Sequence, residues 1–300
     1  MKILVISGGG GSEREVSLRS AEIVRMALAE LGHEVGFIDL NEGEAAVLAA
    51  AAAAELVLPI VHGTDGEDGS LQELLDRSNT PYLGSNAAVS RLCFDKVQFK
   101  ALLSQNGILV PDGEVVTAAT FGQSRLARAP FVLKPIAEGS SVGVMVARSL
   151  PFDGARAAEL LARYDRMLVE ELIVGVEITV PVLGDEALPV VEILPPEGQE
   201  FDYANKYNGA SRELCPAVSL DEATQGRARA LALRVHELAG VRHLSRTDMI
   251  VTHEGGVYVL EINTMPGLTA QSLLPRSAAV AGLDFVELVE RLVELAVAVG

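Results

Sequence analysis

Residues 2–18 read KILVISGGGGSEREVSL, an uninterrupted apolar run followed by four glycines and the expected start of a helix. Such a run is typical of a strand that is covered on both faces of a parallel sheet. Ser12 and Glu15 form a capping-box pattern, which predicts a helix reaching about Leu31. Further strands are expected at 34–40, 56–61 and 81–85, with an alanine-rich helix after the first of these and another helix at 70–77. Repeated strand–helix units predict an open parallel sheet whose loops at the strand C-termini are available for ligands.

The remaining two thirds of the chain predict two smaller α+β units. A helix over residues 86–105 leads into the first unit, and the second contains a polar segment at 195–210. The expected strands are 114–117, 131–135, 144–147, 167–172, 177–183 and 188–194, and the expected helices are 154–164, 221–239 and 285–299, with a hairpin at 245–263. We therefore expect an α/β protein of three lobes, at 1–85, 86–174 and 175–300.

The composition excludes several classes of protein. The 300 residues include 24 Lys and Arg against 41 Asp and Glu, which gives a formal net charge of −17. This acidity argues against nucleic acid or an anionic membrane surface as a partner, because both need a basic face. The N-terminus lacks a signal-peptide pattern, and the longest apolar tract, at 45–54, is too short to span a bilayer. Cys93 and Cys215 form neither a disulfide framework nor a zinc motif, so we expect a reduced, cytoplasmic protein.

The first two glycine-rich segments differ from known nucleotide motifs. Glu13 stands where the third glycine of a dinucleotide fingerprint would fall, and no phosphate-loop Gly-Lys-Ser/Thr follows. A carboxylate there would repel phosphate and attract an ammonium group, or it is simply a first-turn acid stabilised by the helix dipole. His62 opens the loop HGTDGEDG at 62–69, directly after a strand, where open α/β sheets bind ligands. We interpret this loop as functional, with a surface turn as the alternative.

A third glycine-rich segment, EGSSVG at 138–143, lies between two expected strands. This arrangement is similar in principle to the flap that covers nucleotide phosphates in kinases. Lys134 ends the strand that enters the flap, and a cation in that position suits a phosphate. A plain hairpin loop is the alternative.

The turn HEGG at 253–256 predicts a hairpin in which position 252 faces 257, 248 faces 261 and 246 faces 263. Alternation then places Arg246, Asp248, Glu261 and Asn263 on one face. The opposite, apolar face would contain Met249, Val251, Tyr258, Leu260 and Ile262. Two carboxylates and an amide oxygen suit magnesium, and the arginine suits a transferring phosphoryl group. An ordinary polar sheet face is the alternative.

Several blocks in this order resemble the D-alanine–D-alanine ligases, a family of the ATP-grasp superfamily, over nearly the whole chain. The blocks are SEREVSL at 12–18, HGTDGEDG at 62–69, Asp95-Lys96, Lys134-Pro135 with 138–143, Lys206-Tyr207, Arg246-Thr247-Asp248 and EINTMPG at 261–267. The resemblance implies a three-lobed ATP-grasp architecture, in which an N-terminal parallel-sheet domain precedes two α+β lobes that enclose ATP. Three of the five lysines in the chain fall at its phosphate positions, where an ammonium group acts as a compact point charge.

The resemblance also implies roles for single residues. Around ATP it implies Lys96, Lys134 and Lys206 at the phosphates, and Glu170, Ile173 and Glu177 at adenine and ribose. It implies Asp248, Glu261 and Asn263 as ligands of two magnesium ions, with manganese as a substitute. At the first D-alanine it implies that Glu13 binds the ammonium group in a triad with Ser140 and Tyr207, and that His62 lies nearby. It implies Arg246 and the Gly267 N–H at the reacting centre. At the second D-alanine it implies Ser272 and Leu273 as ligands of the carboxylate.

The implied reaction forms D-alanyl-D-alanine for peptidoglycan synthesis. ATP phosphorylates the carboxylate of the first D-alanine, and the amine of the second attacks the acyl-phosphate, giving ADP and phosphate. The protein would position these groups and neutralise charge, while a mobile loop at 195–210 would exclude water. The implied partners are D-alanine, ATP and a second copy of the chain in a homodimer.

Glu171 departs from the family pattern, which often has a lysine at this position beside the adenine site. Tyr207 fits dipeptide formers rather than the depsipeptide branch, in which histidine is usual, but this one residue leaves the second substrate open. The alternatives are an ATP-grasp ligase for another amino-acid pair or for D-alanine and D-lactate, and a nucleotide-binding protein without catalysis. A nicotinamide oxidoreductase is disfavoured by Glu13 in the failed fingerprint.

Overall fold

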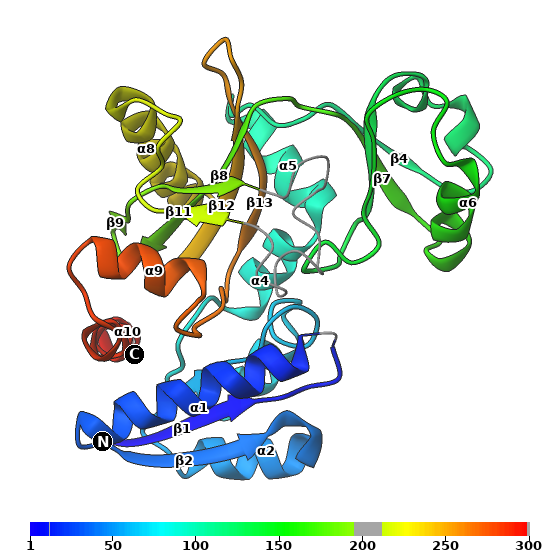
Figure 1. Ribbon diagram of the computed structural model, residues 1–300. Coiled ribbons are helices and arrows are strands. Elements are labelled where there is room, and N and C mark those ends of the chain that lie inside the picture. The colour runs from blue at the N-terminus through cyan, green and yellow to red at the C-terminus, as the bar shows by residue number, and fades with distance from the viewer. Residues whose placement is uncertain (12, 195–211, 299–300) are drawn as a thin grey trace.

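The computed structural model describes residues 1–11, 13–194 and 212–298, which form three separate sheets (Figure 1). The N-terminal sheet is parallel, with the order β2-β1-β3. Its strands are β1 (Lys2–Ser7), β2 (Glu34–Asp39) and β3 (Leu56–Pro59), and its helices are α1 (Arg14–Glu30), α2 (Glu44–Ala52) and α3 (Ser70–Asp76). The open parallel sheet predicted from the first part of the sequence is confirmed.

Ser12, the first residue of the predicted capping box, lies outside the described residues. Helix α1 has Glu13 as its N-cap residue, and the side chain of Glu13 makes no hydrogen bond to the helix. Its carboxylate instead accepts a hydrogen bond from Ser140. The strand predicted at 81–85 is reduced to a single bridge between Tyr82 and Val57. Gly84, with a φ of +100°, turns the chain away after that bridge.

The helix predicted over 86–105 is two helices, α4 (Ala87–Phe94) and α5 (Lys96–Gln105). Asp95 separates them because its backbone is extended and its carboxylate accepts hydrogen bonds from the N–H groups of Val97 and Gln98. The break places Lys96 at the first position of α5, from which its ammonium group reaches the carbonyl oxygen of Glu138.

The central sheet is antiparallel, with the order β4-β7-β5-β6. Its strands are β4 (Gly113–Val116), β5 (Phe131–Pro135), β6 (Met145–Ala147) and β7 (Met167–Glu171), and α6 (Gly154–Arg163) lies beside them (Figure 1). Phe121, Phe131 and Phe152 pack edge to face in its core, with ring centroids 5.0 to 5.9 Å apart. The segment 138–143 connects β5 to β6, as predicted, and we call it the flap.

The C-terminal sheet has the order β11-β10-β8-β12-β13, and the short strand β9 pairs with β8. Its strands are β8 (Val176–Leu183), β9 (Glu186–Ala187), β10 (Val191–Leu194), β11 (Arg212–Leu214), β12 (Leu244–Val251) and β13 (Val257–Asn263). Helix α8 (Glu222–Leu238) packs against it, and α9 (Leu273–Val280), which the sequence did not predict, and α10 (Phe285–Ala298) follow. Neither these nor any other described helix is long and apolar enough to cross a membrane.

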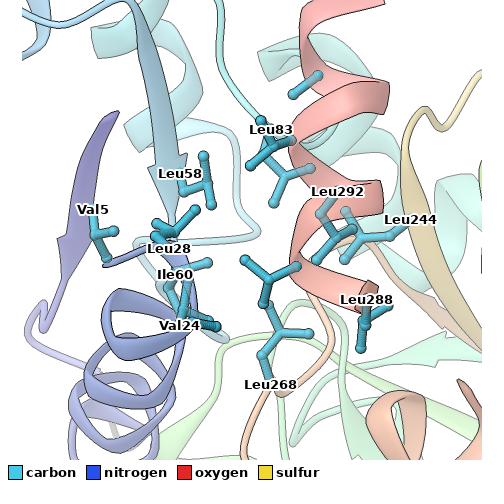
Figure 2. Packing of buried hydrophobic residues seen from close by; sticks show 14 of the residues in the cluster. Val5, Val24, Leu28, Leu58, Ile60, Leu83, Leu244, Leu268, Leu288 and Leu292 are labelled. Carbon is cyan, nitrogen blue, oxygen red and sulfur yellow. The ribbon is translucent and has the colours of Figure 1, made fainter. Parts of the chain in front are cut away.

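One hydrophobic core joins the two ends of the chain. Figure 2 shows Val24 and Leu28 of α1 near Leu288 and Leu292 of α10, with Leu268 between the two groups. Helix α1 packs directly against α10. This shared core fixes the N-terminal sheet relative to the C-terminal segment, so that loops from both meet at one site.

Candidate active site

A cavity of about 510 Å³ lies between the central and C-terminal sheets. Side chains from β5, β6 and β7 line one side, and side chains from β8, β10, β12 and β13 line the other. The predicted site residues that line it are Lys96, Lys134, Glu170, Ile173, Glu177, Asp248, Glu261 and Leu273. Apolar walls with a few charged groups suit a ligand that has an apolar ring at one end and anionic groups at the other.

Carboxylate and carbonyl oxygens bind the two lysines of the cavity. The Lys96 ammonium donates a hydrogen bond of 2.7 Å to the carbonyl oxygen of Glu138 and lies 3.2 Å from the Glu261 carboxylate. The Lys134 ammonium lies 2.6 Å from the Glu170 carboxylate. Burial opposes the charged form of Lys134, but the negative charges of Glu170 and Glu261 outweigh it and raise its pKa. Lys134 is therefore positively charged at neutral pH, as a phosphate ligand must be.

The Glu170 carboxylate also forms an ion pair with Lys100 of α5. Burial opposes ionisation of Glu170, but the two lysines outweigh it and lower its pKa. The sequence patterns do not single out Lys100, although it lies four positions after Lys96, on the same face of a helix. That spacing is the signal from which its place near the site could have been inferred.

The hairpin of β12 and β13 brings the four predicted polar residues together. Arg246 faces Asn263, and Asp248 faces Glu261, as predicted. Asp248 and Glu261 line the cavity. The alternation of side chains along the two strands therefore gives the predicted polar face at the end of the hairpin away from its turn.

Nearer the turn the predicted register is wrong by one residue. The alignment shifts after Asp248 at a β-bulge, so that position 257 faces 251 instead of 252. Val259 consequently joins the core, whereas Tyr258 and Leu260, predicted for the apolar face, are only half-buried. Leu260 lines the cavity. The bulge thus turns one apolar side chain from the core toward the site.

Arg246 is bound to Asp248 on its own strand. Its Nε and Nη2 atoms each lie 2.9 Å from one of the two carboxylate oxygens. Asp248 also accepts hydrogen bonds from the Thr179 hydroxyl at 2.5 Å and the Asn263 amide at 3.2 Å. Burial opposes the charge of Arg246, but Asp248 outweighs it and raises the pKa of the guanidinium. A permanently charged guanidinium in this place can stabilise negative charge that develops on a reacting oxygen.

Glu13 lies where the N-terminal loops meet the flap. The Ser140 hydroxyl donates a hydrogen bond of 2.5 Å to its carboxylate. Two glycines also approach this carboxylate, since a Cβ atom on Gly63 would lie 2.3 Å from Glu13 Oε2 and one on Gly139 would lie 2.9 Å away. The φ angles of Gly63 and Ser140 are +65° and +48°. Segments that the sequence singled out separately therefore converge on one carboxylate, which can bind an ammonium group.

His62 joins the loop after β3 to the segment after β13. Its Nδ1 lies 2.9 Å from the carbonyl oxygen of Met265, and its Nε2 lies 3.1 Å from the Ser20 hydroxyl. Burial lowers the pKa of His62, so its ring is neutral at pH 7 and Nδ1 donates its proton to the carbonyl. His62 thus helps to fix the position of the chain just before Gly267.

Glu67, which lies within the glycine-rich loop at 62–69 but has no predicted role, makes a second connection between the same two segments. Its carboxylate accepts hydrogen bonds from the N–H groups of Gly63 at 3.0 Å, Thr264 at 2.9 Å and Met265 at 3.2 Å. Burial and the negative charge of Glu13 raise the pKa of Glu67 to about 7. Its partners on the far segment lie 197 and 198 positions away, so only the folded chain shows this role.

The other predicted residues follow β13 or lie outside the described residues. Ser272 is the N-cap residue of α9, and its hydroxyl accepts a hydrogen bond of 3.0 Å from the Thr269 N–H. A Cβ atom on Gly267 would lie 2.8 Å from that hydroxyl, so Gly267 and Ser272 are in contact. Lys206 and Tyr207, with the whole loop predicted at 195–210, lie outside the described residues.

Two sheets that enclose a cavity lined by two lysines and several carboxylates are the arrangement of an ATP-grasp enzyme. A family model described as D-ala D-ala ligase C-terminus matches residues 102–294. A D-alanine–D-alanine ligase of Nitratidesulfovibrio vulgaris is 41% identical over 300 residues, which cover 98% of each chain. The chain belongs to the D-alanine–D-alanine ligase family.

Solved structures agree with this assignment. A D-alanine–D-alanine ligase from Bacillus anthracis is 30% identical and has a TM-score of 0.86, covering 100% of this chain and 98% of that chain. A structure of the B. anthracis enzyme complexed with ATP is 31% identical and has a TM-score of 0.85, covering 100% and 97%. The likeness includes all three sheets, so the predicted three-lobed ATP-grasp architecture is confirmed.

Proposed function

We propose that the protein joins two D-alanine molecules to D-alanyl-D-alanine for peptidoglycan synthesis and converts ATP to ADP and phosphate. The observation that carries this proposal is the convergence of Lys96 and Lys134 with Asp248 and Glu261 on one cavity. The named reaction of the 41% identical relative and the ATP complex of the B. anthracis enzyme support it. ATP phosphorylates the first carboxylate, which makes phosphate available as a leaving group. The amine of the second D-alanine then attacks the acyl-phosphate.

In this proposal Lys96 and Lys134 bind the phosphates of ATP, and Glu170, Ile173 and Glu177 surround adenine and ribose. All five residues line the same cavity, which supports their assignment to one ligand. Lys206 is proposed for the terminal phosphate from the resemblance alone, because it lies outside the described residues.

The hairpin has the donor set of a magnesium site. Asp248, Glu261 and Asn263 supply two carboxylates and an amide on one face, and the side chains of Asp248 and Asn263 are 3.2 Å apart. The described residues hold no group of three His, Cys, Asp or Glu side chains suited to a metal ion. Magnesium nevertheless suits this set, because it binds through one or two carboxylates and substrate phosphates. We propose that the three residues hold two Mg²⁺ ions, or Mn²⁺ in their place, which neutralise phosphate charge.

For the first D-alanine, we propose that Glu13 binds the ammonium group and that Ser140 holds the Glu13 carboxylate in place. The 2.5 Å hydrogen bond between these side chains supports this assignment. His62 borders the amino-acid site, and Tyr207, outside the described residues, joins the triad by resemblance.

At the reacting centre, we propose that Arg246 and the Gly267 N–H stabilise the negative charge of the acyl-phosphate and of the tetrahedral intermediate. The charged, partly buried guanidinium of Arg246 supports its role. We propose that Ser272 and Leu273 bind the carboxylate of the second D-alanine. The contact between Gly267 and Ser272 supports a location for that carboxylate next to the reacting centre.

The test is a product assay with ATP, Mg²⁺ and a panel of D-alanine, L-alanine, other D-amino acids and D-lactate. We expect D-alanine alone to give D-alanyl-D-alanine, ADP and phosphate in equal amounts by mass spectrometry and phosphate release. Turnover with another pair but not with D-alanine would contradict the substrate assignment. ATP binding without product from any pair would indicate a nucleotide-binding protein without catalysis. EDTA should abolish turnover, and MgCl₂ or MnCl₂ should restore it.

We also propose that the protein is cytoplasmic and homodimeric. Cys93 and Cys215 are both free thiols, which suits a reducing compartment. The homodimer is supported by the resemblance alone. Analytical ultracentrifugation tests it, and a monomer at micromolar concentration would contradict it.

A further inference from the structure

Glu170 lies between two lysines in the interior of the protein. Its Oε2 lies 2.6 Å from Lys134 Nζ, and its Oε1 binds Lys100 Nζ. The side chains of Glu170, Lys100 and Lys134 are only 2%, 8% and 9% exposed. Lys134 and Glu170 line the cavity, whereas Lys100, on α5, is not part of its wall. The carboxylate therefore has one cation on the side of the nucleotide site and another behind it.

The two lysines contact different oxygens of Glu170, so one contact can break while the other persists. If Lys134 binds a phosphate of ATP, its ammonium group gives up part of its interaction with Glu170. A buried carboxylate that loses its only cation is strongly destabilised, because neither water nor another charge compensates it. Without a second cation, this loss would oppose nucleotide binding.

We propose that Lys100 is a positioning residue that keeps the Glu170 carboxylate paired when Lys134 binds phosphate. The proposal rests on the proposed function, because it requires Lys134 to bind ATP. Lys100 touches neither ATP nor D-alanine in this role. It acts through Glu170 and thereby allows Lys134 to exchange one anionic partner for another.

The electrostatics of the cluster agree with this role. Burial and the positive charge of Lys134 lower the pKa of Lys100 to about 7, against the opposing effect of Glu170. When Lys134 turns toward phosphate, this like charge moves away and the protonated form of Lys100 becomes more favourable. The interaction of Lys100 with Glu170 therefore becomes stronger when the interaction of Lys134 with Glu170 becomes weaker.

The test compares Lys100→Met with Lys100→Arg and with Lys2→Met, which replaces an exposed lysine far from the cluster. Initial rates give kcat and the KM values for ATP and D-alanine, and calorimetric titration with Mg-ADP gives nucleotide affinity. We expect Lys100→Met to weaken Mg-ADP binding and raise the KM for ATP about tenfold or more. The KM for D-alanine should stay nearly constant. Lys100→Arg should retain most of the affinity, and Lys2→Met should match the wild type.

The same replacement in a Glu170→Gln protein separates the electrostatic role from loss of packing. A neutral amide needs no cation, so adding Lys100→Met to Glu170→Gln should change Mg-ADP affinity less than about twofold. An equal loss in both backgrounds would show that Lys100 only packs, and unchanged affinity in Lys100→Met would also overturn the proposal. Lys100→Gln supplies a second neutral variant if Lys100→Met does not fold. A wild-type protein that binds Mg-ADP without forming dipeptide would overturn the proposed reaction, while the binding comparison would still decide the role of Lys100.

Discussion

The Ser140 hydroxyl donates a 2.5 Å hydrogen bond to the Glu13 carboxylate, although 127 positions separate the two residues in the sequence. Ser140 belongs to the flap of the central sheet, and Glu13 immediately precedes α1 of the N-terminal sheet. The next flap residue, Ser141, lines the cavity proposed for ATP. The hydrogen bond therefore connects the proposed nucleotide site to the proposed ammonium site of the first D-alanine.

Ser140→Ala should lower kcat/KM for D-alanine about ten- to a hundredfold, because a hydrogen bond to a charged group contributes about 1.5–3 kcal/mol. Initial rates with varied D-alanine and saturating ATP measure this effect. Ser78→Ala is the control, since the Ser78 hydroxyl bonds to the Leu75 carbonyl oxygen at the end of α3. Equal losses in the two variants would contradict a specific role for Ser140.

Gly63→Ala should lower activity at least about tenfold, because a Cβ atom 2.3 Å from Glu13 Oε2 must displace the carboxylate. Gly107→Ala is a matched control. Gly107 has a similar φ of +70°, but a Cβ atom there meets nothing within 4 Å. An alanine at either position has the same backbone strain of about 1–2 kcal/mol, because both φ angles are positive. We therefore expect only Gly63→Ala to lose activity. Steady-state rates and urea unfolding of both proteins check this, and similar rates would refute the steric argument.

Glu67→Gln should change how the free energy of unfolding depends on pH. Burial and Glu13 raise the pKa of Glu67 from 4.5 to about 7, so in this window the folded protein holds a proton that the unfolded chain has lost. This group therefore makes the free energy of unfolding fall as pH rises from about 4.5 to about 7, by up to about 3 kcal/mol. Urea unfolding at about pH 5 and about pH 8 measures this decrease in the free energy of unfolding. The decrease should be smaller, or absent, in Glu67→Gln, and it should be as large as in the wild type in the control Glu254→Gln, which changes an exposed residue.

Arg246→Ala should lower kcat by about 10²–10³-fold, which is the usual cost of removing one donor that stabilises a developing negative charge. Mg-ADP affinity should change less than about threefold, because the lysines that bind phosphate remain in place. Arg291→Ala, which removes an exposed arginine from α10, is the control. Normal turnover in Arg246→Ala would exclude the proposed mechanism.

Elements with one dominant local pattern were predictable from the sequence. Strands β1 and β5 have the bounds expected from their apolar runs. The run of β1 ends before Gly8, and that of β5 ends at Pro135. Helix α9 was not predictable, because its segment contains Pro275 and has no clear polar face. Proline is nevertheless tolerated in the first turn of a helix, where its missing N–H is not needed. The lobe boundaries near residues 85 and 174 remain predictions.

The site was predictable where strand alternation alone decides which side chains share a face. Asp248 and Glu261 are opposite each other for this reason, although the bulge next to them made the register near the turn wrong. No role was predicted for Glu67, although it lies in the loop at 62–69, or for Lys100, because their partners Thr264 and Glu170 are brought to them only by folding, from 197 and 70 positions away. The roles assigned to individual site residues remain predictions that the experiments above test.

The core shared by the first strand and the last helix also bears on how the chain folds during its synthesis. Ile3 and Val5 of β1 belong to the same buried cluster as Leu288 and Leu292 of α10. The ribosome makes β1 long before α10, so the apolar face of the N-terminal sheet stays incompletely covered until residues beyond 285 emerge. Strand β1 is thus among the last elements to reach native packing, although it is made long before α10. A nascent chain that stops before α10 exposes an apolar surface of the kind that chaperones bind.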